Sequence, residues 1–378
     1  MKLLHVLTTL DVGGAEMHVL EQVRGQVARG HDVRVVYLKG EGTLSDDYRE
    51  AGASAVRRVA AGPLFPLRLR GDLAWCDVVH SHLLKADALT AVAALLAGKR
   101  RHYVSGKHND EQVLRRPSVS RVHGLIGRVP ARTIVLSEHV GRFVEEHGRV
   151  PRTAQSRVYY GLDPEPFERA AKYVDRAAIR GEFGFEPDDV VFTCVARFAP
   201  QKAHEVLLKA LAHARATDPR IVLLLVGDDP FGDGRARAES VARELGLDGS
   251  SGRSPAVFAG IRRDVPDLLA ASDVFCMASR WEGLGLVFLE AMATSLPVLS
   301  TNVSAIPEVV IDGETGRLVP PDDPEAMAAA MVELAADPAL RSRFGSAGHA
   351  RVVERFGLDR MVDETIAIYA EVLDAAQG

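Results

Sequence analysis

Ser279-Arg280-Trp281-Glu282-Gly283-Leu284-Gly285-Leu286-Val287-Phe288-Leu289-Glu290-Ala291-Met292-Ala293 is the stretch that decides the fold. The apolar residues 274–277 before it predict a buried parallel strand, and Gly283 and Gly285 then allow a tight turn. From about Gly285 the residues favour a helix, with apolar side chains at helical spacing. A strand, a glycine loop and a helix predict an α/β fold, and the unpaired amides at the helix start suit a phosphate.

Two carboxylates bracket this loop. Glu282 stands before the turn, and Glu290 lies about a turn and a half into the expected helix. A phosphate at the helix start would have one carboxylate on each side, and each could accept hydrogen bonds from sugar hydroxyls. The alternative is that both are ordinary solvated acids, because glycine loops before helices are common.

The composition bounds the architecture and the location of the protein. A length of 378 residues predicts two domains, and 47% hydrophobic with 26% charged residues indicates ordinary globular cores. No apolar run is long enough to span a bilayer, and residues 1–7 become polar too soon for a signal peptide. Cys76, Cys194 and Cys276 are widely spaced, which favours a reducing, cytoplasmic compartment without disulfides or a metal cluster.

Charge is distributed unevenly along the chain. Residues 1–170 carry 25 lysines and arginines against 19 acidic residues, whereas residues 171–378 carry 21 against 32. The basic excess is concentrated between Lys99 and Arg132. This region is either a solvated face or a surface for an anionic acceptor or an acidic membrane. Nucleic acid is disfavoured, because few aromatic residues are interleaved and no binding module is recognisable.

The N-terminal region also predicts a strand, a glycine loop, a helix and a strand. Residues 2–8 form the first expected strand, Gly13 and Gly14 the loop, and residues 33–38 the second strand. The spacing is not G-x-G-x-x-G and no acid ends the second strand, so a dinucleotide is disfavoured. A plain tight turn is the alternative for the two glycines.

Histidines mark the ends of the following strands. His80 and His82 lie on the same side of an expected strand and lack a third ligand nearby in the sequence, so we expect hydrogen-bonded structural histidines and no metal. His108 follows the next strand and is the best candidate of this half, because α/β folds place ligands beyond the carboxyl ends of strands. An ordinary loop histidine is the alternative.

The second half repeats the plan after a turn-rich boundary at residues 161–166. Arg197 and Lys202 flank the first strand-to-helix loop beyond this boundary, and two cations so placed suit a diphosphate. Surface cations without a ligand are the alternative. Further strands are predicted at residues 133–137, 157–160, 190–196, 221–226, 257–260 and 297–300.

These residues together resemble the retaining glycosyltransferases of family 4. The resemblance is carried by Gly13-Gly14-Ala15-Glu16, by Arg197 with Lys202, and by Glu282 with Glu290. It covers nearly the whole chain and is most specific over residues 257–320. It implies the GT-B architecture, in which two Rossmann-like domains with parallel sheets face each other across a cleft.

The resemblance also implies the domain limits. Residues 1–165 would be the acceptor-binding domain and residues 166–357 the nucleotide-sugar-binding domain. A last helix, residues 358–378, would cross back to pack on the N-terminal domain. The periodic apolar side chains of this helix fit a packed face.

Site roles follow from the same resemblance. Arg197 and Lys202 would neutralise the diphosphate, Glu282 would bind hydroxyls of the donor sugar, and Glu290 would bind the ribose. His108 would lie over the sugar near the acceptor. The other implied donor-binding residues are Gly13, Gly14, Gly260, Ile261, Arg262, Gly283, Leu284, Gly285, Leu286 and Val287, with the base near residues 260–262.

The implied reaction needs no cofactor and no metal. Arg197 and Lys202 could supply the charge of a divalent ion, and the leaving phosphate itself would take the acceptor's proton on the same face. The acidic pair Asp228-Asp229 fits a strand-end turn better than a metal site. The expected substrates are a nucleoside-diphosphate sugar, with UDP favoured, and a hydroxyl acceptor that is lipid-linked or a small molecule.

Two positions depart from the family pattern, and two other functions remain open. Ala203 stands where glycine is frequent, and Tyr160 where asparagine is frequent. One alternative function is another GT-B activity, such as a phosphorylase or a sugar-nucleotide epimerase. The other is a non-catalytic carbohydrate-binding or partner subunit, against which the presence of all four charged site residues argues.

Overall fold

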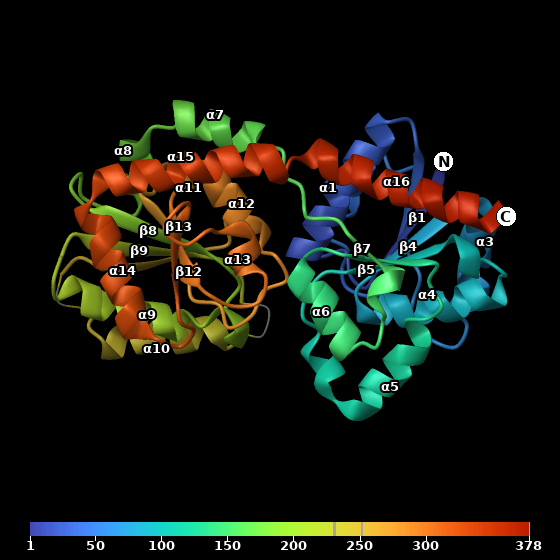
Figure 1. Cartoon of the computed structure of the whole chain (residues 1–378). Coiled ribbons are helices and arrows are strands. Elements are labelled where there is room, and N and C mark those ends of the chain that lie inside the picture. Colours follow the sequence, from blue (N-terminus) through green and yellow to red (C-terminus); the bar gives the residue numbers. More distant parts are fainter. Residues whose placement is uncertain (230–231, 251, 378) are drawn as a thin grey trace. The chain divides into compact units, whose positions relative to one another are not determined.

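The chain forms two compact α/β units. The computed structural model describes residues 1–229, 232–250 and 252–377 (Figure 1). The first unit comprises Met1–Leu162 with Phe356–Gly378, and the second comprises Asp163–Arg355. Each unit has one sheet of parallel strands with helices on both faces, so the predicted α/β class is confirmed.

The sheet of the first unit has seven strands in the order β3-β2-β1-β4-β5-β6-β7, and all neighbours are parallel. The order changes direction between β1 and β4, which makes their carboxyl ends the topological switch point, where such sheets bind ligands. The strands are β1 (Lys2–Leu7), β2 (Asp32–Tyr37), β3 (Ala55–Arg58), β4 (Val78–His82), β5 (Tyr103–Lys107), β6 (Arg132–Val135) and β7 (Gln155–Arg157).

Side chains alternate across this sheet, so each face has its own core. Leu3 and Leu7 of β1 point to one core, and Leu4 and Val6 point to the other. The helices are α1 (Gly14–Ala28), α2 (Ser45–Glu50), α3 (Phe65–Trp75), α4 (Leu84–Leu96), α5 (Pro117–Ile126) and α6 (Glu138–Glu146), with short 3-10 turns η1 (Arg100–His102), η2 (Gln112–Arg115) and η3 (Arg152–Ala154).

The last helix, α16 (Leu358–Gln377), packs on the first unit as predicted (Figure 1). Its Val362 and Tyr369 belong to the same core as Leu3. Gly25 of α1 allows the close approach, since a Cβ there would lie 2.5 Å from a methyl of Val362. The apolar stripe read in the sequence of this helix is therefore its buried face.

The sheet of the second unit has six parallel strands in the order β10-β9-β8-β11-β12-β13, with the switch point between β8 and β11. Its central strands are covered on both faces, and every residue of β9 is buried, which explains the unbroken apolar runs. The strands are β8 (Val190–Val195), β9 (Ile221–Val226), β10 (Ala256–Gly260), β11 (Val274–Met277), β12 (Val298–Thr301) and β13 (Gly316–Val319).

Helices of the second unit connect these strands. They are α7 (Glu165–Tyr173), α8 (Arg176–Glu182), the 3-10 turn η4 (Pro200–Lys202), α9 (His204–Arg215), α10 (Gly234–Glu244), α11 (Val265–Ala270), α12 (Leu286–Ala293), α13 (Ile306–Val309), α14 (Pro324–Ala336) and α15 (Pro338–Arg355). Among the described residues, no helix is long and apolar enough to cross a membrane.

Three strands differ from the sequence prediction. The strand expected at residues 157–160 is β7, at Gln155–Arg157, because the chain leaves the ladder after Val158 and the hydroxyl of Tyr160 contacts His108 instead. The edge strand β13 of the second sheet was not predicted. The edge strand β3 of the first sheet was not predicted either. Its Arg57 and Arg58 are exposed, so it lacks the apolar run that identifies the other strands.

Candidate active site

Three of the predicted charged residues lie at the switch point of the second sheet. Arg197 follows β8, Lys202 ends the turn η4, and Glu282 follows the neighbouring strand β11. Because β8 and β11 are adjacent and parallel, their carboxyl ends meet at one edge of the sheet. This topology brings together residues that are about eighty positions apart in the sequence.

Lys202 and Glu282 form a direct ion pair in this edge. The Lys202 ammonium donates to Glu282 Oε1, and the two side chains are only 13% and 7% exposed. Ser279 Oγ donates to the same carboxylate oxygen at 2.7 Å. Ser279 was not among the predicted site residues, although it stands three residues before Glu282 in the same loop.

The two loops that carry this pair are joined by hydrogen bonds. The Arg280 amide donates to the Gln201 carbonyl at 2.8 Å, and the Gln201 side-chain amide donates to the Trp281 carbonyl at 2.7 Å. The Arg280 guanidinium also pairs with Glu205 and Asp322. These contacts hold Lys202 and Glu282 in register without involving either charge.

The turn before α9 contains an alanine in the left-handed region. Ala203 has φ of 47°, which costs a residue with a Cβ about 1–2 kcal/mol. Helix propensity therefore does not decide this position, because Ala203 stands outside the helix that begins at His204. The frequency of glycine at this position in the family has a conformational reason.

Arg197 is the exposed cation of the site. Its guanidinium makes no hydrogen bond or ion pair with the residues that the structure describes. Lys202, by contrast, is already neutralised by Glu282. Arg197 is thus the site cation that can meet an anion without first giving up a protein partner.

The glycine loop leads directly into α12. Gly285 has φ of +84°, and a Cβ there would lie 2.6 Å from the Phe288 ring, so the position requires glycine. The amides of Leu286 and Val287 open the helix, where no intrahelical acceptor is available to them. Leu284 is buried and anchors the loop. The backbone thus has the glycine turn and the open helix start that the sequence predicted; phosphate binding there stays a prediction.

Glu290 stands on the fifth residue of α12. Burial raises its pKa to about 7, so near neutral pH this carboxyl is divided between its neutral and ionised forms. Glu282, in contrast, lies beside a fixed ammonium group. Glu282 and Glu290, which the sequence predicted as two carboxylates of one site, therefore have different electrostatic surroundings.

The predicted base-binding residues lie farther along the sheet. Gly260 ends β10 with φ of +71°, and β10 is three strands away from β11, roughly 14 Å by strand spacing. Ile261 is 70% exposed. The Arg262 guanidinium is engaged with Asp264 and Glu182, which raise its pKa further. The structure does not bring these residues into contact with Glu282.

In the first unit, the predicted loop follows β1. Gly13 is the extended N-cap of α1, and Gly14 begins the helix. A Cβ on Gly14 would meet nothing within 4 Å, whereas one on Gly13 would lie 2.5 Å from the Glu16 carboxylate. The Glu16 carboxylate accepts a hydrogen bond from Thr9 Oγ1 at 2.6 Å. Of these two glycines, Gly14 has open space beside its Cα, whereas the Glu16 carboxylate fills the space beside Gly13.

His108 lies after β5 in a continuous chain of hydrogen-bonded side chains. His108 Nδ1 is 2.9 Å from the Tyr160 hydroxyl, and its Nε2 is 2.9 Å from His82 Nδ1. His82 Nε2 is in turn 2.9 Å from His5 Nδ1, and His5 Nε2 is 2.9 Å from Gln26 Oε1. The position beyond the strand end was predicted, but this chain of side chains was not.

Gln26, at one end of this series of side chains, fixes which atom donates in each of its hydrogen bonds. Gln26 Oε1 can only accept, so His5 carries its proton on Nε2 and accepts at Nδ1. His82 and His108 then each donate from Nε2, and Tyr160 donates its hydroxyl proton to His108 Nδ1. Burial lowers the pKa of His5 to about 4 and, with the Lys107 charge as a second cause, that of His108 to about 3. Both imidazoles are therefore neutral at pH 7.

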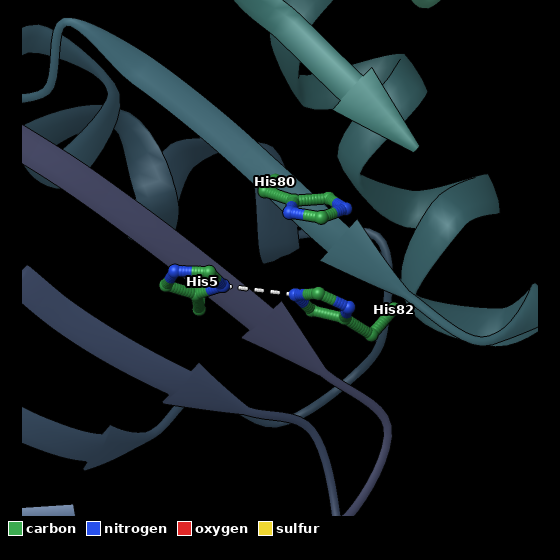
Figure 2. Close-up of side chains that lie close together, drawn as sticks. All are labelled: His5, His80 and His82. Atoms are coloured by element: carbon green, nitrogen blue, oxygen red, sulfur yellow. Dashed lines mark hydrogen bonds between the residues drawn. The ribbon is translucent and has the colours of Figure 1, made fainter. Parts of the chain in front are cut away.

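The prediction of hydrogen-bonded histidines at residues 80 and 82 is confirmed, but its reasoning missed a neighbour. His80 Nδ1 is 2.6 Å from the Tyr369 hydroxyl, and His82 bonds as above. His5 lies opposite His80 in the register of β1 and β4, and its ring is the third of the group (Figure 2). His5 stands in the first predicted strand, but the sequence near it does not show that this strand pairs with β4.

Comparison with known proteins gives the family. The profile described as "Glycosyl transferases group 1" matches residues 175–351, and that described as "Glycosyltransferase Family 4" matches residues 12–166. A D-inositol 3-phosphate glycosyltransferase of Streptomyces bingchenggensis is 31% identical over 408 residues, covering 98% of this chain and 87% of that protein. One of Saccharomonospora viridis is 28% identical, covering 98% and 92%.

Solved structures agree on the fold. HepE of Anabaena, in complex with UDP, has a TM-score of 0.85 at 20% identity and covers 98% of this chain and 100% of that chain. A glycosyltransferase of Rickettsia africae has a TM-score of 0.85 at 19% identity, covering 98% of each chain. These likenesses confirm the predicted GT-B fold. With matches to both profiles and 31% identity over nearly its whole length, the chain belongs to the group 1 glycosyltransferases of glycosyltransferase family 4.

Proposed function

We propose that the protein is a retaining, metal-independent glycosyltransferase of the hexosyl type that uses a UDP-sugar donor and a hydroxyl acceptor. The observation that carries the proposal is the Lys202–Glu282 pair beside the exposed Arg197 and the start of α12. This edge offers two cations and unpaired amides to a diphosphate, and a carboxylate to a sugar. The edge needs no cofactor to supply that charge.

The chemistry follows from this charge distribution. The bond between the anomeric carbon and the diphosphate oxygen breaks, and negative charge develops on that oxygen. Arg197, Lys202 and the amides of α12 stabilise that charge. The acceptor oxygen bonds to the anomeric carbon on the same face, and its proton passes to the leaving phosphate. The configuration is retained, and no protein base is required.

The donor assignment has two supports. A UDP complex is described for HepE, a neighbour with the same fold. Within this chain, Glu290 on α12, after β11, and residues 260–262, after β10, both follow strands of the same parallel sheet and so belong to the same edge of it. We assign the ribose to Glu290 and the base to residues 260–262.

The acceptor assignment rests on relatives and on surface chemistry. The curated relatives are named for D-inositol 3-phosphate, so a phosphorylated polyol is the first small-molecule acceptor to test. A lipid-linked glycan is favoured by α5 and the turn before it. There Val122 and Leu125 are 58% and 69% exposed, and the neighbouring exposed arginines are Arg115, Arg116, Arg121 and Arg128.

The basic run of the sequence is not one surface. Lys107 is buried, where it pairs with Asp87. The exposed arginines of this run are Arg100 and Arg101 at η1 and those around α5. Three free cysteines support a cytoplasmic location, and we place the reaction in glycan or glycolipid synthesis at the inner face of the membrane. Sedimentation with anionic vesicles, compared between wild type and Val122→Ser/Leu125→Ser, tests this placement.

The decisive experiment is calorimetric binding of UDP, GDP and ADP to the wild type and to Lys202→Ala, with and without Mg2+. We expect UDP to bind without Mg2+ and to lose affinity in the variant. The product formed from a UDP-sugar and acceptor is then assigned by NMR, and an axial linkage from an axial donor supports retention. A sugar phosphate or an isomerised sugar nucleotide would indicate the phosphorylase or epimerase alternatives. Absence of binding to any nucleotide would favour a non-catalytic subunit.

A further inference from the structure

The three imidazoles of His5, His80 and His82 converge inside the first unit, on the adjacent strands β1 and β4 (Figure 2). One nitrogen from each ring lies within 4.8 Å of the others, and the side chains are 0–3% exposed. His5 Nδ1 and His82 Nε2 already face each other at 2.9 Å. Three nitrogen ligands around tetrahedral zinc lie roughly 3.3 Å apart, so small movements would suffice to enclose an ion.

We propose that this histidine cluster is a binding site for a divalent transition-metal ion, of which Zn2+ is the type. Imidazole suits zinc, copper and nickel, whereas Mg2+ and Ca2+ require oxygen ligands. Three histidines with a fourth position open are a known zinc arrangement. The site is separate from the charged edge of the second unit, and it does not rest on the function proposed above.

An unsatisfied nitrogen supports the proposal independently of the geometry. His80 Nε2 is buried and has no hydrogen-bond partner among the described residues. A buried polar atom without a partner is costly and marks a site for a missing water or ion. A methyl group at Gly106 would lie 2.8 Å from this nitrogen and 3.0 Å from His82 Nδ1. The same methyl would lie 3.0 Å from His108 Nε2, so glycine at 106 leaves room for the rings of His80, His82 and His108 to approach one another.

The outer partners of the three rings match those of metal-bound histidines. Such a histidine usually donates its second ring N–H to a neighbouring acceptor, which fixes the ring. His5 donates to Gln26, and His80 contacts the Tyr369 hydroxyl; His82 Nδ1 accepts from His108 Nε2 and would donate to it once an ion occupies His82 Nε2. The cluster therefore already has the supporting contacts that hold ligands in place.

Binding requires protons to be rearranged but not lost. An ion between His5 Nδ1 and His82 Nε2 takes the place of the proton that His82 donates there. That proton moves to His82 Nδ1, which then donates to His108 Nε2, and His108 carries its own proton on Nδ1. The number of protons in the chain is unchanged. The ion would thus set the tautomer of His108 from inside the core.

The test is titration of the full-length, chelator-treated protein with Zn2+, followed by calorimetry. We expect one ion per chain, with affinity at least 100-fold weaker in His80→Asn and in His82→Asn. The burial-matched control His123→Asn changes a buried histidine of the same unit outside the cluster and should leave affinity unchanged. Co2+ should give a visible absorption band in the wild type that is absent from His80→Asn.

Tyr369→Phe is the second test variant, for use if the histidine variants do not fold. It removes only the hydroxyl beside His80, and loss of such an outer contact typically weakens binding 10–100-fold. A folded wild type without saturable one-to-one Zn2+ binding overturns the proposal. Unchanged affinity in a folded His80→Asn also overturns it and shows an adventitious surface ion only.

Discussion

The two sheets of this protein place different chemistry at the same topological position. At the switch point of the first sheet, His5, His80 and His82 lie within the strands and are buried and neutral. At the switch point of the second, Lys202 and Glu282 lie in loops beyond the strands and keep opposite charges in contact. The three histidines are desolvated by the sheet and have no opposite charge beside them, whereas Lys202 and Glu282 each have an opposite charge in contact.

The largest effect should come from the charged edge. Lys202→Ala removes a cation that the proposed leaving diphosphate requires, and we expect turnover to fall by about 2–4 kcal/mol of transition-state stabilisation. Lys209→Ala, on the exposed face of α9, is the matched control and should retain turnover. Initial rates of nucleotide release give the comparison, with melting temperatures to confirm folding. Near-normal turnover in Lys202→Ala would remove the residue from the site.

Glu290 tests the donor half of the edge. Glu290→Ala should weaken UDP binding by about 1.5–3 kcal/mol, because a carboxylate that accepts ribose hydrogen bonds is lost. Calorimetric Kd values for UDP, measured above pH 8 where Glu290 is ionised, provide the measurement. An unchanged Kd would show that Glu290 does not bind the ribose. The different surroundings of Glu282 and Glu290 would then not reflect two roles in donor binding.

The same residue gives a pH-dependent stability. Its folded pKa of about 7 stands above the ordinary 4.5, so the folded state binds the proton more tightly than the unfolded state does. Stability from this group is full below pH 4.5 and is lost as the pH rises towards 7. Glu290→Gln should therefore gain about 2 kcal/mol over wild type between pH 5 and pH 8, allowing for partial exposure.

Urea unfolding at the two pH values measures this gain. Glu354→Gln, at an exposed position of α15, is the control and should follow the wild type. If Glu290→Gln and Glu354→Gln show the same pH dependence, the buried carboxyl is not the source of the loss.

The neutral histidine chain should give a smaller effect. Tyr160→Phe removes the hydroxyl that bonds to His108 Nδ1, and we expect kcat/KM to fall by about 1 kcal/mol, the usual value of one hydrogen bond. Tyr159→Phe, one residue earlier, removes a hydroxyl that bonds to Arg157 and should be nearly neutral. Equal rates for both variants would separate the histidine chain from catalysis.

The smallest expected effect concerns Mg2+. Because two cations already stand at the second edge, adding Mg2+ to the assay should change the rate by less than a factor of about 2. Mg2+ prefers oxygen ligands and should not occupy the histidine cluster, so this measurement is independent of Zn2+ binding. A large increase with Mg2+ would show that Arg197 and Lys202 do not carry the diphosphate charge alone.

Most elements could be predicted because their signals are local. The apolar run of β11, the glycine at 285 and the spacing in α12 lie within twenty residues of one another. The pairing of Lys202 with Glu282, the burial of Lys107 and the approach of His5 to His82 could not be predicted. Each depends on which strands become neighbours, and no short stretch of sequence carries that information.

By itself, the sequence determined the α/β class, most of the strands, the family resemblance and the residue types at the charged edge. Apolar periodicity and the conformational freedom of glycine act over a few residues, so a short stretch of sequence is enough to predict these features. The tertiary structure alone decided which charges are paired, which histidines are neutral and where a nitrogen lacks a partner. Strand order sets those contacts, and burial sets the protonation of each group.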